Sequence, residues 1–428
     1  MSPPLEAAAT AETAGLSPVE RVMAQGRRRA TLIMLGPAFV ASIAYVDPGN
    51  FATNISAGAK YGYLLVWVIV AANLMAMLIQ YLSAKLGIVT DRDLPENFRE
   101  HYPRRLSWAM WVQAELISMS TDIAEFIGAA LGLNLLFGVP LLPAGFITGI
   151  VALAILGLQR HGYRRFEVAI TALLGLIFLG FLYEALKIGP SASGTVHGLV
   201  PHFAGNDSLY LAVGIIGATV MPHAIYLHSA LTNKRVPARN DNERKRVLRF
   251  ERLDVVVALG IAGLVNLTML IVAAKLFHAH GLTGVDTIQG AHDGFTNLVG
   301  GGAALVFAVA LLSSGLSSSS VGTYAGQVVM AGFINLRIPL LVRRVVTMAP
   351  ALIVLAIGVS PTSALVLSQV VLSFGIPFAL IPLVILTSRR DVMGVHVNSR
   401  LTTTLAWGMA ALISGLNVFL LAQTFGFA

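Results

Sequence analysis

The sequence predicts an all-α membrane protein that crosses the bilayer many times, and three observations carry that prediction. Hydrophobic residues make up 56% of the 428 residues and charged residues only 12%, whereas soluble proteins carry about 25% charge. Apolar runs of roughly 20 residues, the length of a spanning helix, recur along the whole chain. The cations cluster between these runs, so the net charge of +8 does not indicate nucleic-acid binding.

Eleven runs are long enough to be spanning helices. They lie near residues 31–61, 63–89, 106–137, 142–159, 166–187, 209–233, 253–278, 303–333, 338–357, 361–388 and 402–425. Residues 1–30, which begin with an Ala-, Pro-, Ser- and Thr-rich stretch, are expected to form a disordered tail. Placing this tail in the cytoplasm puts nearly all loop arginines inside, as the positive-inside rule requires. The odd number of spans then leaves the C-terminus, Ala428, outside.

Two short breaks interrupt apolar runs, one in each half of the chain. The first is Asp47-Pro48-Gly49-Asn50, and the second is Met221-Pro222-His223. Proline removes a backbone donor and disturbs the preceding turn, and inside lipid such a break survives only where it lines a cavity or packs against protein. A matched pair of interrupted helices indicates the binding site of a secondary transporter.

The breaks fall in spans one and six, which divides the chain into two halves. Residues 31–187 hold spans one to five, residues 209–388 hold spans six to ten, and residues 402–425 add an eleventh span. Because five is odd, the second half enters the membrane from the opposite side. The sequence therefore predicts a five-plus-five inverted repeat of the LeuT-like kind, with spans one and six unwound at mid-membrane.

Carboxylate and thioether groups at the breaks indicate a transition-metal ion as ligand. A buried carboxylate such as Asp47 costs at least a few kcal/mol unless it is paired or coordinates an ion, although Asp47 could also cap the half-helix that follows. Asn50 could cap or offer a neutral oxygen, and the carbonyl of Ala44 would add another. Methionine usually only packs, but Met221 adjoins the break, and a soft ligand there would select against Ca²⁺ and Mg²⁺.

Further polar side chains lie in or near these spans. His223 and His228 could ligate metal or carry protons, with packing as the alternative for His228. Gln369 in span ten could complete a metal shell or bond between helices.

Three acids share one face of span three. Glu115, Asp122 and Glu125 are spaced by seven and three residues, so they form a stripe that cannot plausibly face lipid. The stripe predicts a polar path or proton relay. The alternative is a set of salt bridges to Arg343 and Arg344 of span nine, and the two interpretations are compatible.

The sequence lacks the residues and motifs of several common enzyme and metal sites. The chain has no cysteine, which excludes disulfides and thiolate metal sites. It also lacks the zinc-protease, phosphate-loop and nucleophile-elbow motifs. We expect a transporter rather than an enzyme, driven by an ion gradient and carrying no prosthetic group.

The two breaks with their flanking residues resemble the Nramp family of divalent metal transporters, and within it the bacterial manganese transporters. The resemblance rests on Ala-Tyr-Val-Asp-Pro-Gly-Asn-Phe-Ala-Thr and on Gly-Ala-Thr-Val-Met-Pro-His-Ala-Ile-Tyr-Leu-His-Ser, and it covers essentially the whole chain after the tail. It implies proton-coupled import of Mn²⁺, Fe²⁺ and related ions across the inner (plasma) membrane, by a protein that functions as a monomer.

The resemblance also assigns roles to residues. The metal ligands would be Asp47, Asn50 and Met221, with the carbonyls of Ala44 and Ala218 and, in some conformations, Gln369. The proton route would use Asp47, His223, Asp122 and Glu125.

Two other functions remain possible on the sequence. A sodium-coupled carrier of amino acids also breaks spans one and six, but usually with glycine-rich segments that bind a carboxylate through backbone amides. A channel or a non-transporting metal receptor is the second alternative, although a channel usually needs a pore built from symmetric subunits.

Overall fold

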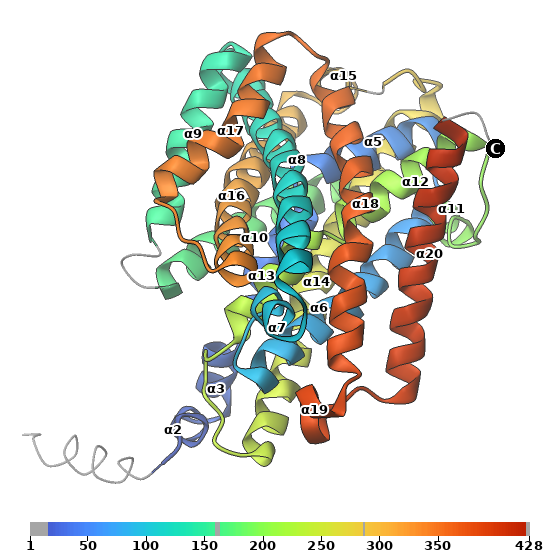
Figure 1. Ribbon diagram of the computed structural model, residues 1–428. Helices are drawn as coiled ribbons and strands as arrows, with labels where there is room; N and C mark the ends of the chain where they lie inside the picture. Colours follow the sequence, from blue (N-terminus) through green and yellow to red (C-terminus); the bar gives the residue numbers. More distant parts are fainter. Residues whose placement is uncertain (1–15, 159–162, 286, 425–428) are drawn as a thin grey trace, which may run out of the picture.

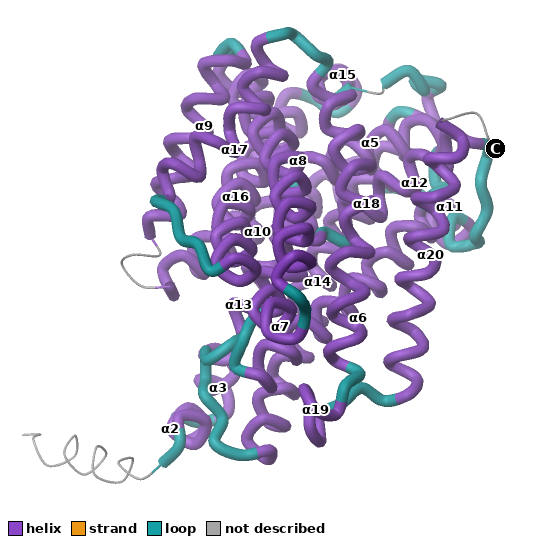
Figure 2. The backbone as a smooth tube through the Cα atoms, in the orientation of Figure 1, coloured by secondary structure: helices purple, strands orange, loops and turns teal. Residues whose placement is uncertain are grey.

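The computed structural model describes residues 16–158, 163–285 and 287–424, and within them it contains helices and loops but no strand (Figures 1 and 2). The helices of the first half are α2 (Pro18–Ala24), α3 (Arg27–Met34), α4 (Pro37–Ser42), η1 (Ile43–Val46), α5 (Pro48–Tyr61), α6 (Val66–Thr90), α7 (Leu94–His101), α8 (Arg104–Phe137), α9 (Leu141–Gly157), α10 (Tyr163–Ile188) and α11 (Ala192–His197). The helices that follow are α12 (Asn206–Thr219), α13 (Pro222–Thr232), α14 (Asp241–Leu276), η3 (His278–His280), α15 (Ile288–Leu298), α16 (Gly301–Ile334), α17 (Leu340–Ala356), α18 (Pro361–Thr387), α19 (Arg390–Met393), η4 (Gly394–His396) and α20 (Arg400–Thr424).

The predicted spans correspond to helices of this structure. Within the described residues, eight segments are long and apolar enough to cross a membrane, and they belong to α6, α8, α10, the α12–α13 pair, α14, α16, α18 and α20. The other three predicted spans are shorter helices, namely the α4–η1–α5 series, α9 and α17. Large apolar side chains remain exposed on the outer helices, such as Leu179 on α10 and Val418 on α20, as expected where a helix faces lipid.

The N-terminal segment differs from the expected disorder. Residues 1–15 lie outside the described residues, but Pro18–Ala24 form α2. Ser17 begins this helix with a capping box, in which its hydroxyl accepts from the Glu20 amide and the Glu20 carboxylate accepts from the Ser17 amide. Val19 is fully buried against Ile88 and Val247. The helix forms because a local cap and an apolar anchor act together.

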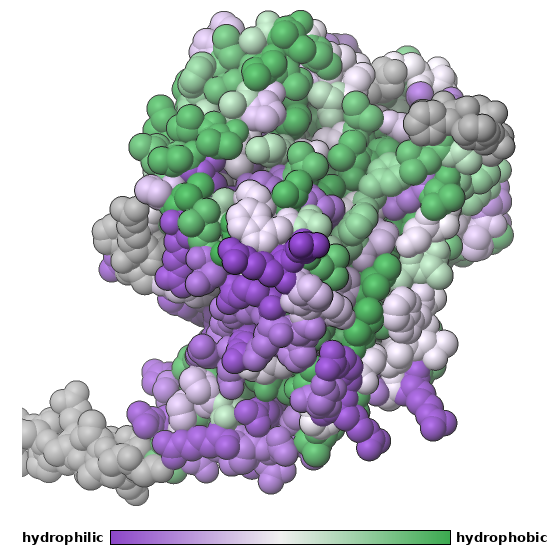
Figure 3. Space-filling view, in the orientation of Figure 1, coloured by the Kyte–Doolittle hydropathy of each residue, from purple (hydrophilic) through white to green (hydrophobic). Residues whose placement is uncertain are grey.

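The long helices α8 and α16 pack along each other, and α5 packs on α14 (Figure 1). Small residues permit the α8–α16 contact: a Cβ atom on Gly315 would lie 2.7 Å from the backbone nitrogen of Ala129. Hydrophilic side chains gather over the lower part of the molecule, around α2, α7 and α19, whereas the upper part is mostly hydrophobic (Figure 3). Arg21, Arg99 and Arg390 belong to these three helices, so cations contribute to the hydrophilic end.

The close α8–α16 contact predicts that Gly315→Ala lowers the melting temperature in detergent. The added methyl group must displace the backbone of α8, and overpacking of this kind typically costs about 1–3 kcal/mol. Gly175→Ala on α10 is the matched control, because a Cβ atom at that position would meet nothing within 4 Å. Equal melting temperatures for the two variants would contradict the packing described.

Candidate metal site at two helix interruptions

The first interruption lies at Asp47, between η1 and α5. Asp47 is extended (φ −81°, ψ 168°), and Pro48 occupies the first position of α5, where its missing N–H costs nothing. One carboxylate oxygen of Asp47 accepts from the Asn50 amide at 2.8 Å, while the side-chain oxygen of Asn50 accepts from the Asp47 amide at 3.2 Å. Both side chains are fully buried. The capping role left open for Asp47 and Asn50 is therefore present.

The last carbonyl groups of η1 take side-chain donors from other helices. Asn266 Nδ2 on α14 donates to the Tyr45 carbonyl at 2.7 Å, and Ser314 Oγ on α16 donates to the Val46 carbonyl at 2.6 Å. Ala44 lies in the same turn and is 1% exposed. Helices distant in sequence thus satisfy the backbone that the interruption frees.

The second interruption lies between α12 and α13. Val220 and Met221 leave the helical conformation (Met221 φ −78°, ψ 122°), and Pro222 begins α13. Met221 is fully buried and its side chain makes no capping hydrogen bond. Ala218, in the last turn of α12, is also fully buried. This break therefore presents a thioether and the end of a helix to the protein interior.

Gln369 on α18 joins the first interruption. Its Nε2 donates to the second carboxylate oxygen of Asp47 at 3.3 Å. A Cβ atom on Gly49 would lie 1.8 Å from this Nε2, and a Cβ atom on Gly217 would lie 2.0 Å from the Gln369 carbonyl oxygen. Glycines next to both interruptions thus let α18 approach. Gly217 is a site-forming residue that sequence reasoning missed, because a single sequence does not show which helix approaches it.

Several buried polar atoms at the interruptions have no hydrogen-bond partner among the described residues. They are Asn50 Nδ2, Gln369 Oε1 and Thr219 Oγ1. Buried polar atoms are nearly always satisfied. Unpaired polar atoms at the two interruptions are expected in a site that receives a polar or hydrated ligand.

The acids of α8 meet the two arginines of α17. Arg343 Nη2 donates to Glu115 at 2.7 Å, and Arg344 Nη1 donates to Asp122 at 3.3 Å. Glu125 is fully buried, and no cation lies within 4.0 Å of it among the described residues. The predicted ion pairs therefore exist, and they involve two acids of the three.

The two histidines of α13 belong to different surroundings. His223 is buried, with Nδ1 3.4 Å from Thr121 Oγ1 on α8, next to the acid stripe. His228 instead contacts Gln80 on α6 through Nδ1 at 2.9 Å and Glu251 on α14 through Nε2 at 2.9 Å. The structure therefore brings His223, but not His228, into contact with α8.

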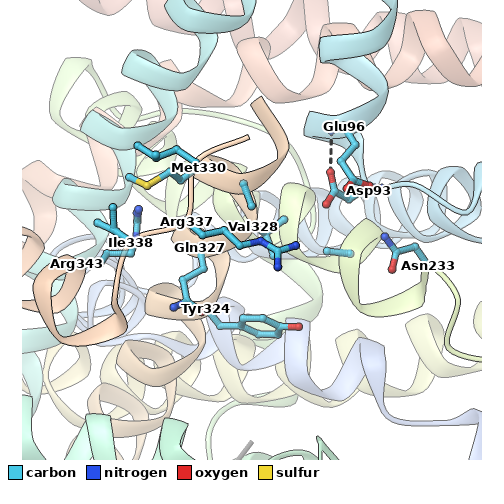
Figure 4. Close-up of a pocket in the computed structure, with 13 residues that line it drawn as sticks. Asp93, Glu96, Asn233, Tyr324, Gln327, Val328, Met330, Arg337, Ile338 and Arg343 are labelled. Carbon is cyan, nitrogen blue, oxygen red and sulfur yellow. Dashed lines mark hydrogen bonds between the residues drawn. The ribbon is translucent and has the colours of Figure 1, made fainter. Parts of the chain in front are cut away.

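A cavity of about 440 Å³, lined by both polar and apolar side chains, lies where α7, α13, α16 and α17 meet. Asp93, Glu96 and Asn233 lie on one side of it, and Ile338 and Arg343 lie on the other (Figure 4). Arg343, the partner of Glu115, therefore connects the acids of α8 with this cavity. Sequence reasoning did not identify Asp93, although its capping box with Glu96 follows a recognisable residue pattern.

Comparison with known proteins identifies the family. The model of the family described as "Natural resistance-associated macrophage protein-like" matches residues 38–423. The chain belongs to the Nramp family. The divalent metal cation transporter MntH of Bacillus subtilis is 55% identical over 398 residues, 93% of each chain, and that of Deinococcus radiodurans is 52% identical over 93% of this chain and 91% of its own.

Solved structures confirm the fold class. The manganese transporter of Eremococcus coleocola, in complex with an aromatic bis-isothiourea compound, has a TM-score of 0.84 and 33% identity over 91% of this chain and 86% of its own. Mhp1, a nucleobase-cation-symport-1 family transporter, has a TM-score of 0.58 at 14% identity over 90% of each chain, which concerns the fold alone. The Nramp resemblance and the LeuT-like, all-α fold class are thus confirmed, and the relatives are described as transporters rather than enzymes.

The contact of Gln369 with Gly49 predicts a coupled effect on stability. Gly49→Ala should lower the melting temperature, because its methyl group overlaps the Gln369 amide, at a cost of about 1–3 kcal/mol. Gln369→Ala should relieve the overlap, so that the double variant loses less than the two single variants together. Additive losses in this double-mutant cycle would contradict the contact.

Burial raises the pKa of Asp93 from 3.8 to about 7, with a further contribution from the Glu96 carboxylate. The folded state then holds the Asp93 proton more tightly than the unfolded state, so stability falls as the pH rises towards 7. Between pH 5 and 8 this effect of Asp93 lowers the free energy of unfolding by on the order of 2–3 kcal/mol. Asp93→Asn keeps a capping oxygen but does not titrate, so we expect its free energy of unfolding to lack this fall. Melting temperatures of both proteins across this range provide the measurement, and parallel curves would contradict the expectation.

Proposed function

We propose that this protein is a proton-coupled secondary transporter that imports divalent transition metals such as Mn²⁺ and Fe²⁺ by alternating access. One observation carries the proposal: a carboxylate and a thioether lie buried at two helix interruptions, each next to a proline, in a chain of the Nramp family. The descriptions of the relatives as divalent metal cation transporters support the substrate class.

The metal would be held by Asp47, Asn50 and Met221, with the carbonyls of Ala44 and Ala218 and with Gln369. The burial of all these residues favours a dehydrated ion, because a site without water exchanges the ion's hydration shell for protein ligands. In the structure each carboxylate oxygen of Asp47 accepts a neutral hydrogen bond, from Asn50 and Gln369. Movement of the Gln369 amide would free one oxygen for the ion.

The coupled proton would leave Asp47 along α8. His223 lies beside Thr121, the residue before Asp122, and the Asp122–Arg344 and Glu115–Arg343 pairs lead to the cavity at Asp93. Glu125, which lies one turn from Asp122 on α8 and is fully buried, would be a further member of this relay. His228 would act outside this relay, through its contact with Glu251.

The orientation proposed is that of the sequence, with the N-terminus in the cytoplasm and the C-terminus outside. The hydrophilic end that carries α2 and α7 would then face the cytoplasm (Figure 3). The protein would reside in the inner (plasma) membrane and work as a monomer.

The role proposed for Met221 predicts a loss of selectivity without a loss of transport. Met221→Ala should still carry Mn²⁺ into liposomes but should admit Ca²⁺ or Mg²⁺, because the soft ligand that disfavours these hard ions is gone. Met393→Ala is the control, since Met393 is a buried methionine of α19, which lies at the hydrophilic end of the molecule (Figure 1). Unchanged exclusion of Ca²⁺ and Mg²⁺ by Met221→Ala would refute the role.

A further inference from the structure

A second cavity, of about 300 Å³, lies between α5, α12 and α18. These are the helices that also carry Asn50, Ala218 and Gln369 of the candidate metal site. They lie close together in the upper right of Figure 1, away from α2 and α7. In the proposed orientation the cavity is therefore on the outer side of the site.

The helix geometry gives the separation between the cavity and the site. Ser56 lines the cavity and follows Asn50 by six residues, which is about 9 Å along α5. Val366 lines it as well and precedes Gln369 by three residues, about 5 Å along α18. Thr53, which lies between Asn50 and Ser56 on α5, packs against Gly214 of α12, where a Cβ atom would lie 3.3 Å from Thr53 Cγ2. The cavity thus neighbours the site, and its wall includes none of the candidate ligands.

The cavity wall carries two opposite charges that do not form an ion pair with each other. Asp207 in the first turn of α12 and Lys60 near the end of α5 both line it. Within the described residues, neither has an ion-pair partner within 4.0 Å, and neither side chain makes a hydrogen bond. Tyr210, Thr362 and Ser363 add further polar groups to the wall. The Asp207 carboxylate is therefore available to a soluble cation.

The size and chemistry of the cavity suit an ion that has kept its water. Six water molecules at about 30 Å³ each occupy about 180 Å³, so a hydrated divalent ion fits into 300 Å³. The wall provides one carboxylate and several hydroxyl groups but no sulfur or imidazole among the described residues. Such a wall attracts a hydrated cation without distinguishing one divalent metal from another.

We propose that this cavity is an outer capture site for hydrated divalent cations, in which Asp207 attracts the ion and Lys60 opposes its retention. The inference rests on the proposed function, because it presumes that metal enters from this side. A fixed negative charge at the mouth of a site raises the local cation concentration and the rate of encounter. Lys60 offsets that attraction, so the ion can move on to Asp47 instead of remaining bound.

The test is Mn²⁺ uptake into liposomes by Asp207→Asn at two ionic strengths. At about 10 mM salt, where the Debye length is about 30 Å, we expect the KM to rise by about three- to tenfold with kcat unchanged. At about 0.3 M salt the difference should fall below about twofold, because screening removes the attraction. Lys60→Gln should lower the KM at low salt. The Mn²⁺/Ca²⁺ selectivity should stay as in the unaltered protein.

Asp293→Asn is the matched control for charge. Asp293 lies on α15, its side chain is 74% exposed, and it is absent from the cavity wall, so Asp293→Asn should change the KM less than Asp207→Asn does. A salt-independent change in Asp207→Asn, no change at all, or an equal change in Asp293→Asn would each overturn the capture site while leaving metal transport intact. Unaltered protein that carries no Mn²⁺ would overturn the proposed function and the capture site together.

Discussion

Satisfying the backbone at two helix interruptions is the constraint on which the rest of this structure depends. Lipid offers no partner for the freed amide and carbonyl groups, so protein groups or the lining of a polar cavity must satisfy them. At the first interruption Asp47 and Asn50 cap each other, and Asn266 and Ser314 reach the free carbonyls from α14 and α16. The helices around the break are therefore fixed in place by the groups that complete its hydrogen bonds.

Close approach of helices is the second requirement, and glycine provides it. Gly49 and Gly217 make room for Gln369, while a Cβ atom on Gly128 of α8 would lie 2.0 Å from Pro48. The side chains that bind or cap are few, and their positions depend on backbones that touch. A larger residue in place of one of these glycines would displace a polar side chain of the site, although glycine itself has no side chain. The geometry of the polar site therefore depends on the packing of the helices around it.

The sequence predicted the parts of this arrangement that are local. Each span depends on one continuous apolar run, and each interruption and the capping ability of Asp47 depend on residues within about one helix turn. The contrast between a polar break and its apolar flanks identified the interruptions. The α2 capping box at Ser17 was equally local, but the composition of the surrounding tail outweighed it.

Contacts between distant segments could be predicted best where opposite charges lie within spans. The carboxylates of α8 favoured cations of other spans as partners, and Arg343 and Arg344 of span nine were the alternative offered, which the structure confirms for Glu115 and Asp122. The contact of His228 with Gln80 could not be predicted from the sequence, because many residues could accept a hydrogen bond from an imidazole. Gly217 escaped notice for the same reason, since its role depends on a helix much further along the chain.

The two halves of span one both pack on α14, but the backbone at the start of each half is fixed by different groups. The amides of Gly36 and Ala38 at the start of α4 donate to the Asp254 carboxylate of α14 at 2.9–3.1 Å. The start of α5 is held instead by its own cap and by Gln369 of α18. Helical hydrogen bonds do not continue across Asp47, so a shift of α4 need not be transmitted to α5. Asp47 and Asn50 lie at this junction, so the candidate ligands occupy a place in span one where helical hydrogen bonds do not fix α4 relative to α5.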